Sequence, residues 1–225
     1  MTGDELKQRN IAVMGDDLGK QYTALFQEFT ALYLYWKEFL ELFGTNDKRI
    51  DRLNKAAPGF FQMLQEQQFE TNVLHLARLT DSPETGKKLN LTVCNLPNLV
   101  ADEYLKKQLS ALVEDVRQKT EFCRDWRNRR FAHRDLMLAM QDGGAKPLPA
   151  ATKEKFFEAM QAVSDLLNLM ERFYFKGGCS FADVAPHNGA ATLLFMLGFG
   201  VMGRERMQEK IAKGDFTSLD RPESI

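Results

Sequence analysis

Apolar residues recur every three or four positions along most of the chain, which is the spacing of one face of an α-helix. The most regular stretch runs from Asp17 to Phe43, is rich in aromatic residues, and stops at Gly44. Further helices are predicted from Pro58 to the residues before Ser82, from Asp102 through Asp135, from Thr152 to the residues before Gly177, and from about Ala190 to beyond Arg204.

The segments between these helices are short and polar or rich in Gly and Pro, as in the loop from Gln141 to Pro149. Loops are also predicted over 44–48 and 81–88, and a brief helical turn over 90–95. The pattern predicts an all-α protein, an antiparallel bundle of four to six helices. We expect an N-terminal extension over 1–16, one helical domain over 17–213 and a flexible C-terminal tail over 214–225.

Composition narrows the class of protein. The chain has 225 residues, is 44% hydrophobic and carries a formal net charge of −1, which excludes a generally cationic nucleic-acid binder. The 3 cysteines lack C-x-x-C spacing, so neither a disulfide framework nor a zinc site is predicted. Because no apolar signal segment and no uncharged run of membrane-spanning length occurs, we expect a soluble, cytoplasmic protein.

The stretch from Glu121 to Asp135 concentrates polar chemistry, because it holds five arginines, one asparagine and one histidine. If it continues the helix from Asp102, Arg127 lies on the apolar stripe with Val116 and Cys123. In the same way His133 falls with Phe122 and Trp126, and Arg129 falls on the opposite, solvent-facing side. A charge directed at packed surface is costly unless a partner meets it, so a partner for Arg127 is expected.

The order Arg127, Asn128, four residues and His133 resembles the R-polar-x(n)-H signature of the HEPN superfamily. The segments L-A-R-L-T-D at 76–81 and N-L-T at 90–92 are similar to an abortive-infection-type branch of that superfamily. The resemblance implies a helical fold and a metal-independent endoribonuclease of toxin–antitoxin or phage-defence systems, with RNA as substrate. It implies a homodimer in which the motifs of two protomers meet in one cleft, and in some members an antitoxin protein as partner.

On this resemblance the catalytic residues are Arg127, Asn128 and His133, with no metal and no cofactor. The chemistry suits these side chains, since an imidazole titrates near neutral pH and a guanidinium binds phosphate. Cleavage by 2′-OH attack would leave a 2′,3′-cyclic phosphate and a 5′-hydroxyl. The surrounding arginines are expected to contact the RNA backbone without reading sequence; they are Arg124, Arg129, Arg130 and Arg134.

The same residues allow a second interpretation without catalysis. Asp125, Arg129 and His133 are spaced four residues apart and would form a solvated row of ion pairs, while Arg127 pairs with a carboxylate of another helix. The protein would then be a catalytically inactive HEPN-like dimerisation or binding module. This second interpretation predicts helix pairing with a partner protein or nucleotide and no turnover. We expect a homodimer through the motif helix, because the aromatic first helix and the motif helix carry much apolar surface.

Other motifs carry less weight. The glycines at 198, 200 and 203 match G-x-G-x-x-G, but they follow a helical pattern rather than a strand, so they indicate close helix packing instead of dinucleotide binding. His75 and His187 have no second ligand at helical spacing, so each is interpreted as a hydrogen-bonded core or loop residue.

Overall fold

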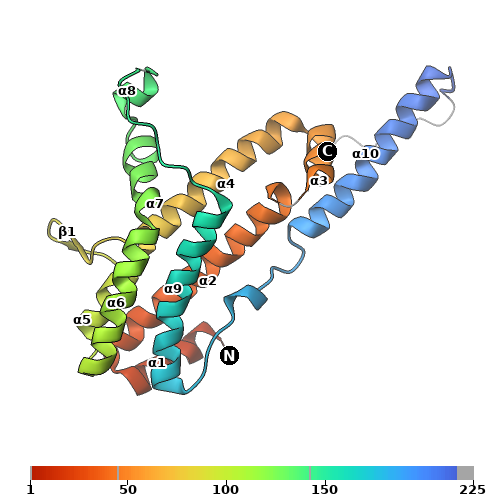
Figure 1. The fold of residues 1–225 in the computed structure, drawn as a ribbon. Helices are drawn as coiled ribbons and strands as arrows, with labels where there is room; N and C mark the ends of the chain where they lie inside the picture. Colours follow the sequence, from red (N-terminus) through yellow and green to blue (C-terminus); the bar gives the residue numbers. More distant parts are fainter. Residues whose placement is uncertain (1, 45, 142, 217–225) are drawn as a thin grey trace. The chain divides into compact units, whose positions relative to one another are not determined.

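The computed structural model describes residues 2–44, 46–141 and 143–216. Within them the chain is almost entirely helical, and the strands form one two-stranded hairpin (Figure 1). This confirms the all-α prediction. The chain divides into two compact units, which are described separately below: unit 1 combines the N-terminal residues up to Trp36 with Gln68–Val184, and unit 2 combines Lys37–Gln67 with the C-terminal residues from Ala185.

Unit 1 contains most of the helices and the hairpin. Helices α2 (Asp16–Phe43) and α4 (Pro58–Leu79) each contribute one part to it. Its other elements are α1 (Gly3–Met14), β1 (Glu84–Thr85), β2 (Lys88–Leu89), the 3-10 turn η1 (Val93–Asn95), α5 (Leu96–Leu99), α6 (Glu103–Lys119), α7 (Glu121–Trp126), the π turn η2 (Arg127–Phe131), α8 (Leu136–Ala139), α9 (Lys153–Phe175) and the 3-10 turn η3 (Phe181–Asp183).

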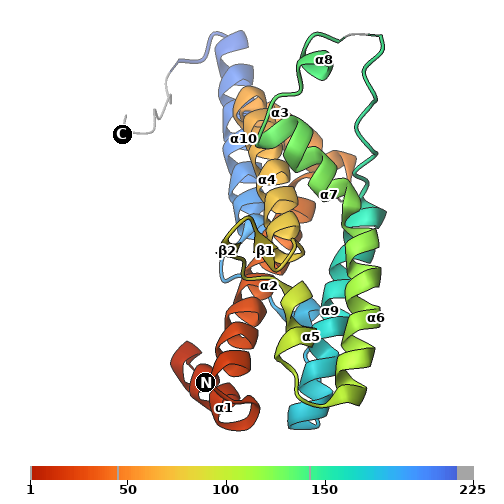
Figure 2. The same ribbon diagram turned by 90° about the vertical axis from the view of Figure 1, so that its left-hand side faces the viewer.

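The core of unit 1 is built around α9, which begins at the predicted Thr152 cap and packs beside α6 (Figures 1 and 2). The ring of Phe156 on α9 stacks on Trp36 of α2, with 4.1 Å between ring centroids. Phe122 of α7 meets the same phenylalanine edge-on, with centroids 6.2 Å apart. These contacts bring α2, α7 and α9 together and fix where the polar stretch that follows α7 begins.

Helix α1 packs onto unit 1 although its residues were expected to form an extension. Gly19 of α2 permits the close approach, because a Cβ there would lie 2.6 Å from Ile11 Cα. The buried Asn10 side chain donates a hydrogen bond to Thr23 Oγ1 at 2.9 Å. Arg9 reaches Glu171 of α9 at 3.4 Å, and its guanidinium lies over the Phe175 ring.

The aromatic face of α2 is mostly buried in the core. Tyr22 and Phe29 are fully buried and Trp36 nearly so, whereas Tyr35 is 50% exposed. The apolar face of this helix therefore serves mainly as core, and Tyr35 is a part of it that stays exposed. Other large exposed apolar side chains include Leu136 of α8, Met140 directly after it, and Phe195, Met196 and Phe199 on α10 (Ala190–Ala212).

Unit 2 packs α10 against α3 (Asp47–Ala56), a helix that the sequence analysis left out. Asn46 caps α3 by accepting a hydrogen bond from the Arg49 amide at 3.0 Å. Arg52 then donates to the Leu194 carbonyl at 2.9 Å. The unit has its own small core, formed by Leu42, Leu53, Phe61, Ala190 and Leu194.

The boundaries of α2, α4, α9 and α10 agree with the predicted helices within a few residues. Of the predicted C-terminal tail, residues 217–225 lie outside the described residues. In the described part of the chain, no helix combines the length and the apolar character needed to cross a bilayer.

Candidate functional site

The predicted single helix from Asp102 through the motif is wrong, because the chain breaks it twice. Helix α6 ends at Lys119, and α7 starts two residues later at Glu121. The buried Thr120 marks the break, and its hydroxyl donates to the Val116 carbonyl at 2.7 Å. The helical wheel drawn through Val116 therefore does not extend to Arg127.

The second break is a π turn that begins at Arg127 itself. The amide of Ala132 donates to the Arg127 carbonyl at 2.8 Å, which is the i to i+5 pattern of a π-helix. His133 lies beyond this turn in non-helical chain and is exposed. The expectation that it packs with Phe122 and Trp126 is wrong, since Trp126 instead packs against Phe69 and Phe131, with ring centroids 5.3 and 5.6 Å away.

Arg127 does meet the expected partner. Its Nη1 donates to Asp81 Oδ2 in an ion pair, and its Nε donates to Asn128 Oδ1 at 3.0 Å. The side chains of Arg127 and Asp81 are 23% and 25% exposed. The structure thus brings Arg127 and Asn128 together and adds Asp81, the last residue of the L-A-R-L-T-D segment.

Arg129 is held in place rather than facing solvent, so that part of the prediction is wrong. Its side chain is 19% exposed and reaches Asp125 at 3.2 Å and Asp135 at 3.5 Å, and it also donates to the Lys146 carbonyl. The predicted row of ion pairs therefore exists at Asp125 and Arg129, but Asp135 takes the place of His133.

Asp135 also starts α8, since its carboxylate accepts the Leu138 amide at 3.1 Å. This hydrogen bond, together with Arg129, lowers the pKa of Asp135 below its ordinary value. Arg129 consequently ties both ends of the segment that carries His133.

The remaining arginines of the motif divide into two kinds. Arg124 bonds the Thr120 hydroxyl at 2.9 Å and the Arg117 carbonyl, so it joins α7 to the end of α6. Arg130 and Arg134 are exposed, and neither side chain forms a hydrogen bond or an ion pair within the described part of the chain. These two are therefore the motif arginines that remain open to solvent.

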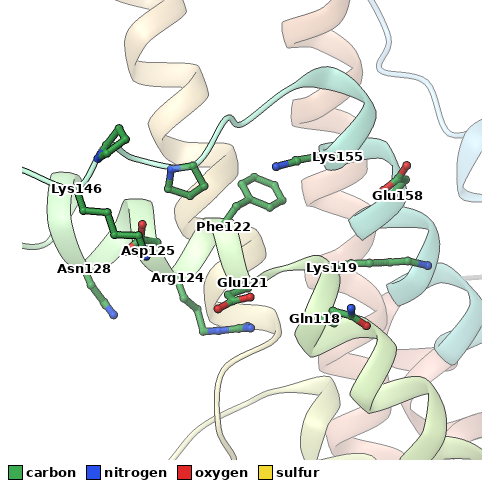
Figure 3. Close-up of a pocket in the computed structure, with 12 residues that line it drawn as sticks. Gln118, Lys119, Glu121, Phe122, Arg124, Asp125, Asn128, Lys146, Lys155 and Glu158 are labelled. Carbon is green, nitrogen blue, oxygen red and sulfur yellow. The ribbon is translucent and has the colours of Figure 1, made fainter.

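A pocket of about 880 Å³ lies beside α7 and η2, and Arg124 and Asn128 are among the residues that line it (Figure 3). Figure 3 shows its lining side chains arriving from the end of α6, from α7 and η2, from the loop before α9, and from the first turns of α9. The basic lining residues are Lys119, Arg124, Lys146 and Lys155, and the acidic ones are Glu121, Asp125 and Glu158.

A second pocket, of about 310 Å³, adjoins Asp81. Within it, His75 of α4 is buried and bonds Glu28 of α2, with 2.8 Å between Nε2 and Oε2. Because a carboxylate only accepts, neutral His75 donates from Nε2. Arg78, Asn90 and Leu91 also line the pocket. The interpretation of His75 as a hydrogen-bonded core residue is confirmed, whereas the pocket beside it was not predicted from the sequence.

Comparison with known protein families shows to which family this chain belongs. The model of the HEPN family AbiU2 matches residues 15–193, which is well over half of the chain and includes the motif and both pockets. The chain belongs to the AbiU2 family of HEPN domains. It is therefore an abortive-infection-related HEPN domain, as the resemblance implied. Comparisons with curated proteins and with solved structures found no match.

Burial of His75 should make the free energy of unfolding of this AbiU2 domain depend on pH. Burial lowers the pKa of His75 below 6.5, although Glu28 opposes the shift. The unfolded chain therefore binds a proton near pH 6.5 that the folded chain does not, and stability falls as the pH drops through that range. In urea unfolding, we expect His75→Gln to lose less stability between pH 7.5 and pH 5.5 than the unsubstituted protein.

The matched control is His187→Gln, because His187 is exposed. This variant should keep the pH slope of the unsubstituted protein. Identical slopes for His75→Gln and the unsubstituted protein would contradict the assignment of a neutral, buried His75.

Proposed function

We propose that this AbiU2 domain is a metal-independent endoribonuclease in which Arg127 binds the phosphate that is cleaved. The observation that supports it most is the way the guanidinium is held. Its Nη1 bonds Asp81 and its Nε bonds Asn128, so two of its five N–H donors are used and Nη2 keeps both of its own. A guanidinium fixed on one side can offer the other to a phosphate without rearrangement.

His133 supplies the proton transfer that the reaction requires. In the proposed step the ribose 2′ oxygen attacks the adjacent phosphorus, the 2′ proton is removed, and the bond from phosphorus to the 5′ oxygen breaks as that oxygen gains a proton. An imidazole can perform either transfer. Because His133 is exposed beyond the π turn, it can reach a substrate that lies against η2.

The two ion pairs of Arg129 restrict the position of the segment that carries His133. Arg129 bonds Asp125 before the π turn and Asp135 after it, so the intervening segment is tied at both ends. We therefore assign Arg129 to positioning, and we assign contacts with the RNA backbone to the exposed Arg130 and Arg134. Asn128 orients the Arg127 guanidinium through the hydrogen bond to Nε.

Cleavage should depend on Arg127 and His133 and should survive EDTA. Under single-turnover conditions on a single-stranded RNA, Arg127→Ala and His133→Ala should each slow cleavage by about 100-fold or more, because each removes charge stabilisation or proton transfer. The products should be a 2′,3′-cyclic phosphate and a 5′-hydroxyl, identified by mass spectrometry.

Two matched variants control this experiment. Arg172→Ala and His187→Ala remove an exposed arginine and an exposed histidine outside the motif, and both should cleave at the unsubstituted rate. Loss of cleavage in EDTA, or an unchanged rate for His133→Ala, would refute the proposed chemistry.

We further propose that the domain forms a homodimer through the segment that follows the motif. Leu136 and Met140 are 73% and 72% exposed and Met137 is 47% exposed, and all three lie within seven residues of His133. Exposed apolar residues grouped in this way mark interaction surfaces. A partner docked there would bring a second copy of the motif close to the first.

Light scattering at micromolar concentration should give about twice the chain mass of 25.8 kDa. Leu136→Ser should shift the population towards monomer, whereas Leu89→Ser, at a hairpin position that is 86% exposed, should leave the dimer intact. A monomer for the unsubstituted protein would remove the composite cleft from the mechanism.

A further inference from the structure

The smaller pocket beside Asp81 has the chemistry of a nucleobase site. Its volume of about 310 Å³ lies at the lower end of the range usual for small-ligand sites, about 300–1,000 Å³. Two helices and the chain after the hairpin line it: Glu28 comes from α2, His75 and Arg78 from α4, and Asn90 and Leu91 from the chain after β2.

Glu28 presents a fixed hydrogen-bond acceptor. One carboxylate oxygen is tied to the buried His75 at 2.8 Å, while the side chain as a whole is 49% exposed. The other oxygen has no hydrogen bond among the residues that the structure describes, and each carboxylate oxygen can accept more than one. The carboxylate therefore offers two adjacent acceptors to a ligand.

Arg78 supplies donors to the same pocket. Arg78 is exposed, and it makes no hydrogen bond or ion pair with another residue that the structure describes. Asn90 donates its amide hydrogens to the Ser82 carbonyl at 2.9 Å and to Thr85 Oγ1 at 2.8 Å. Its carbonyl oxygen thus remains as a further acceptor.

Apolar surface completes the pocket. Leu79 and Leu91 line it, and Leu91 is 42% exposed. Tyr35 packs beside His75, with 6.2 Å between ring centroids, but it does not line the pocket. Leucine surface beside a few fixed polar groups suits a flat heterocycle, since small-ligand sites combine apolar lining with a few placed polar groups.

We propose that this pocket binds an unpaired guanine base, carried by single-stranded RNA or by a free nucleotide. Guanine has two adjacent donors, N1–H and the 2-amino group, which match the two acceptors of the Glu28 carboxylate. Its O6 and N7 are acceptors, which match a guanidinium such as that of Arg78. Adenine and cytosine present one donor beside an acceptor, and uracil flanks its single donor with carbonyl oxygens that a carboxylate repels.

The pocket and the proposed phosphate site share one residue, Asp81. Asp81 lines the pocket and also bonds Arg127, so a base in the pocket brings its own ribose and phosphate near that guanidinium. The guanine site thus rests on the proposed ribonuclease function for its role, as the subsite that selects the nucleotide next to the cleaved phosphate. Its binding chemistry is independent of cleavage.

The test is fluorescence anisotropy with 2′-O-methyl oligouridylates, which lack the attacking 2′-OH and cannot be cleaved. One central position carries guanine, hypoxanthine, adenine or uracil. The guanine oligomer should bind about tenfold or more tightly than the hypoxanthine oligomer, which lacks only the 2-amino group that donates to the Glu28 carboxylate. The adenine and uracil oligomers should be weaker than the guanine oligomer.

Two variants separate the contacts. Glu28→Gln should abolish the difference between guanine and hypoxanthine while retaining an acceptor for His75, and Arg78→Gln should weaken both of these oligomers, since both keep O6 and N7. Glu114→Gln, on an exposed position of α6, is the control and should keep the full preference. Glu28→Asp is a second substitution at this position. Because its shorter side chain withdraws the carboxylate, it should also lose the preference for guanine over hypoxanthine.

Competition with guanosine monophosphate distinguishes the two sources of the base. Displacement of the guanine oligomer by the mononucleotide, in the unsubstituted protein but not in Glu28→Gln, would show that a free nucleotide is sufficient; failure to displace it, with the oligomer preference intact, would show that the base must be carried by RNA. Equal affinity for guanine and uracil oligomers, or a guanine preference that survives in Glu28→Gln, would overturn the proposal.

The outcome is separable from that of the ribonuclease experiment. Guanine preference without cleavage of unmodified RNA would retain the pocket and reject the catalytic proposal. Cleavage that depends on Arg127 and His133 without any base preference would retain the catalytic proposal and reject the guanine pocket.

Discussion

The ion pair between Asp81 and Arg127 is the constraint on which the candidate site depends. It joins the end of α4 to the π turn across 46 positions of sequence, and both side chains are about three-quarters buried. Loss of either partner would leave a partly buried charge without its counter-ion, which is more costly than loss of an exposed pair. The pair leaves Nη2 of the guanidinium without a hydrogen bond to a described residue, and Asp81 also lines the smaller pocket.

The helical framework could be predicted from the sequence because its signals are local. The apolar period of α2 and α9, the Thr152 cap and the glycines that follow α9 each act within a few residues. The break at Thr120 and the π turn could not be predicted in this way. Threonine and arginine are both tolerated in helix interiors, and the turn is held by contacts made far along the chain, such as those of Trp126 with Phe69 and with the Pro149 carbonyl.

The residues of the candidate site also divide into those that the sequence could predict and those that it could not. Arg127 has the partner that was expected, since Asp81 pairs with it, although the helical wheel behind that expectation is interrupted at Thr120. The wheel could not apply to His133, which lies outside the helix, nor could it show that Arg129 is enclosed by Asp125 and Asp135. The pocket around His75 was missed because it depends on tertiary pairing between α2 and α4. Membership of the AbiU2 family shows the type of domain, whereas the chemistry must be argued from these individual contacts.

The most direct test of this arrangement is a double-mutant cycle on Asp81 and Arg127, measured as the free energy of unfolding in urea without RNA. The variants are Asp81→Ala, Arg127→Ala and the two combined. A pair that is mostly buried and hydrogen-bonded should show a coupling free energy of about 1 kcal/mol or more. A coupling indistinguishable from zero would mean that Asp81 does not hold Arg127, and the basis for a fixed guanidinium at the π turn would be lost.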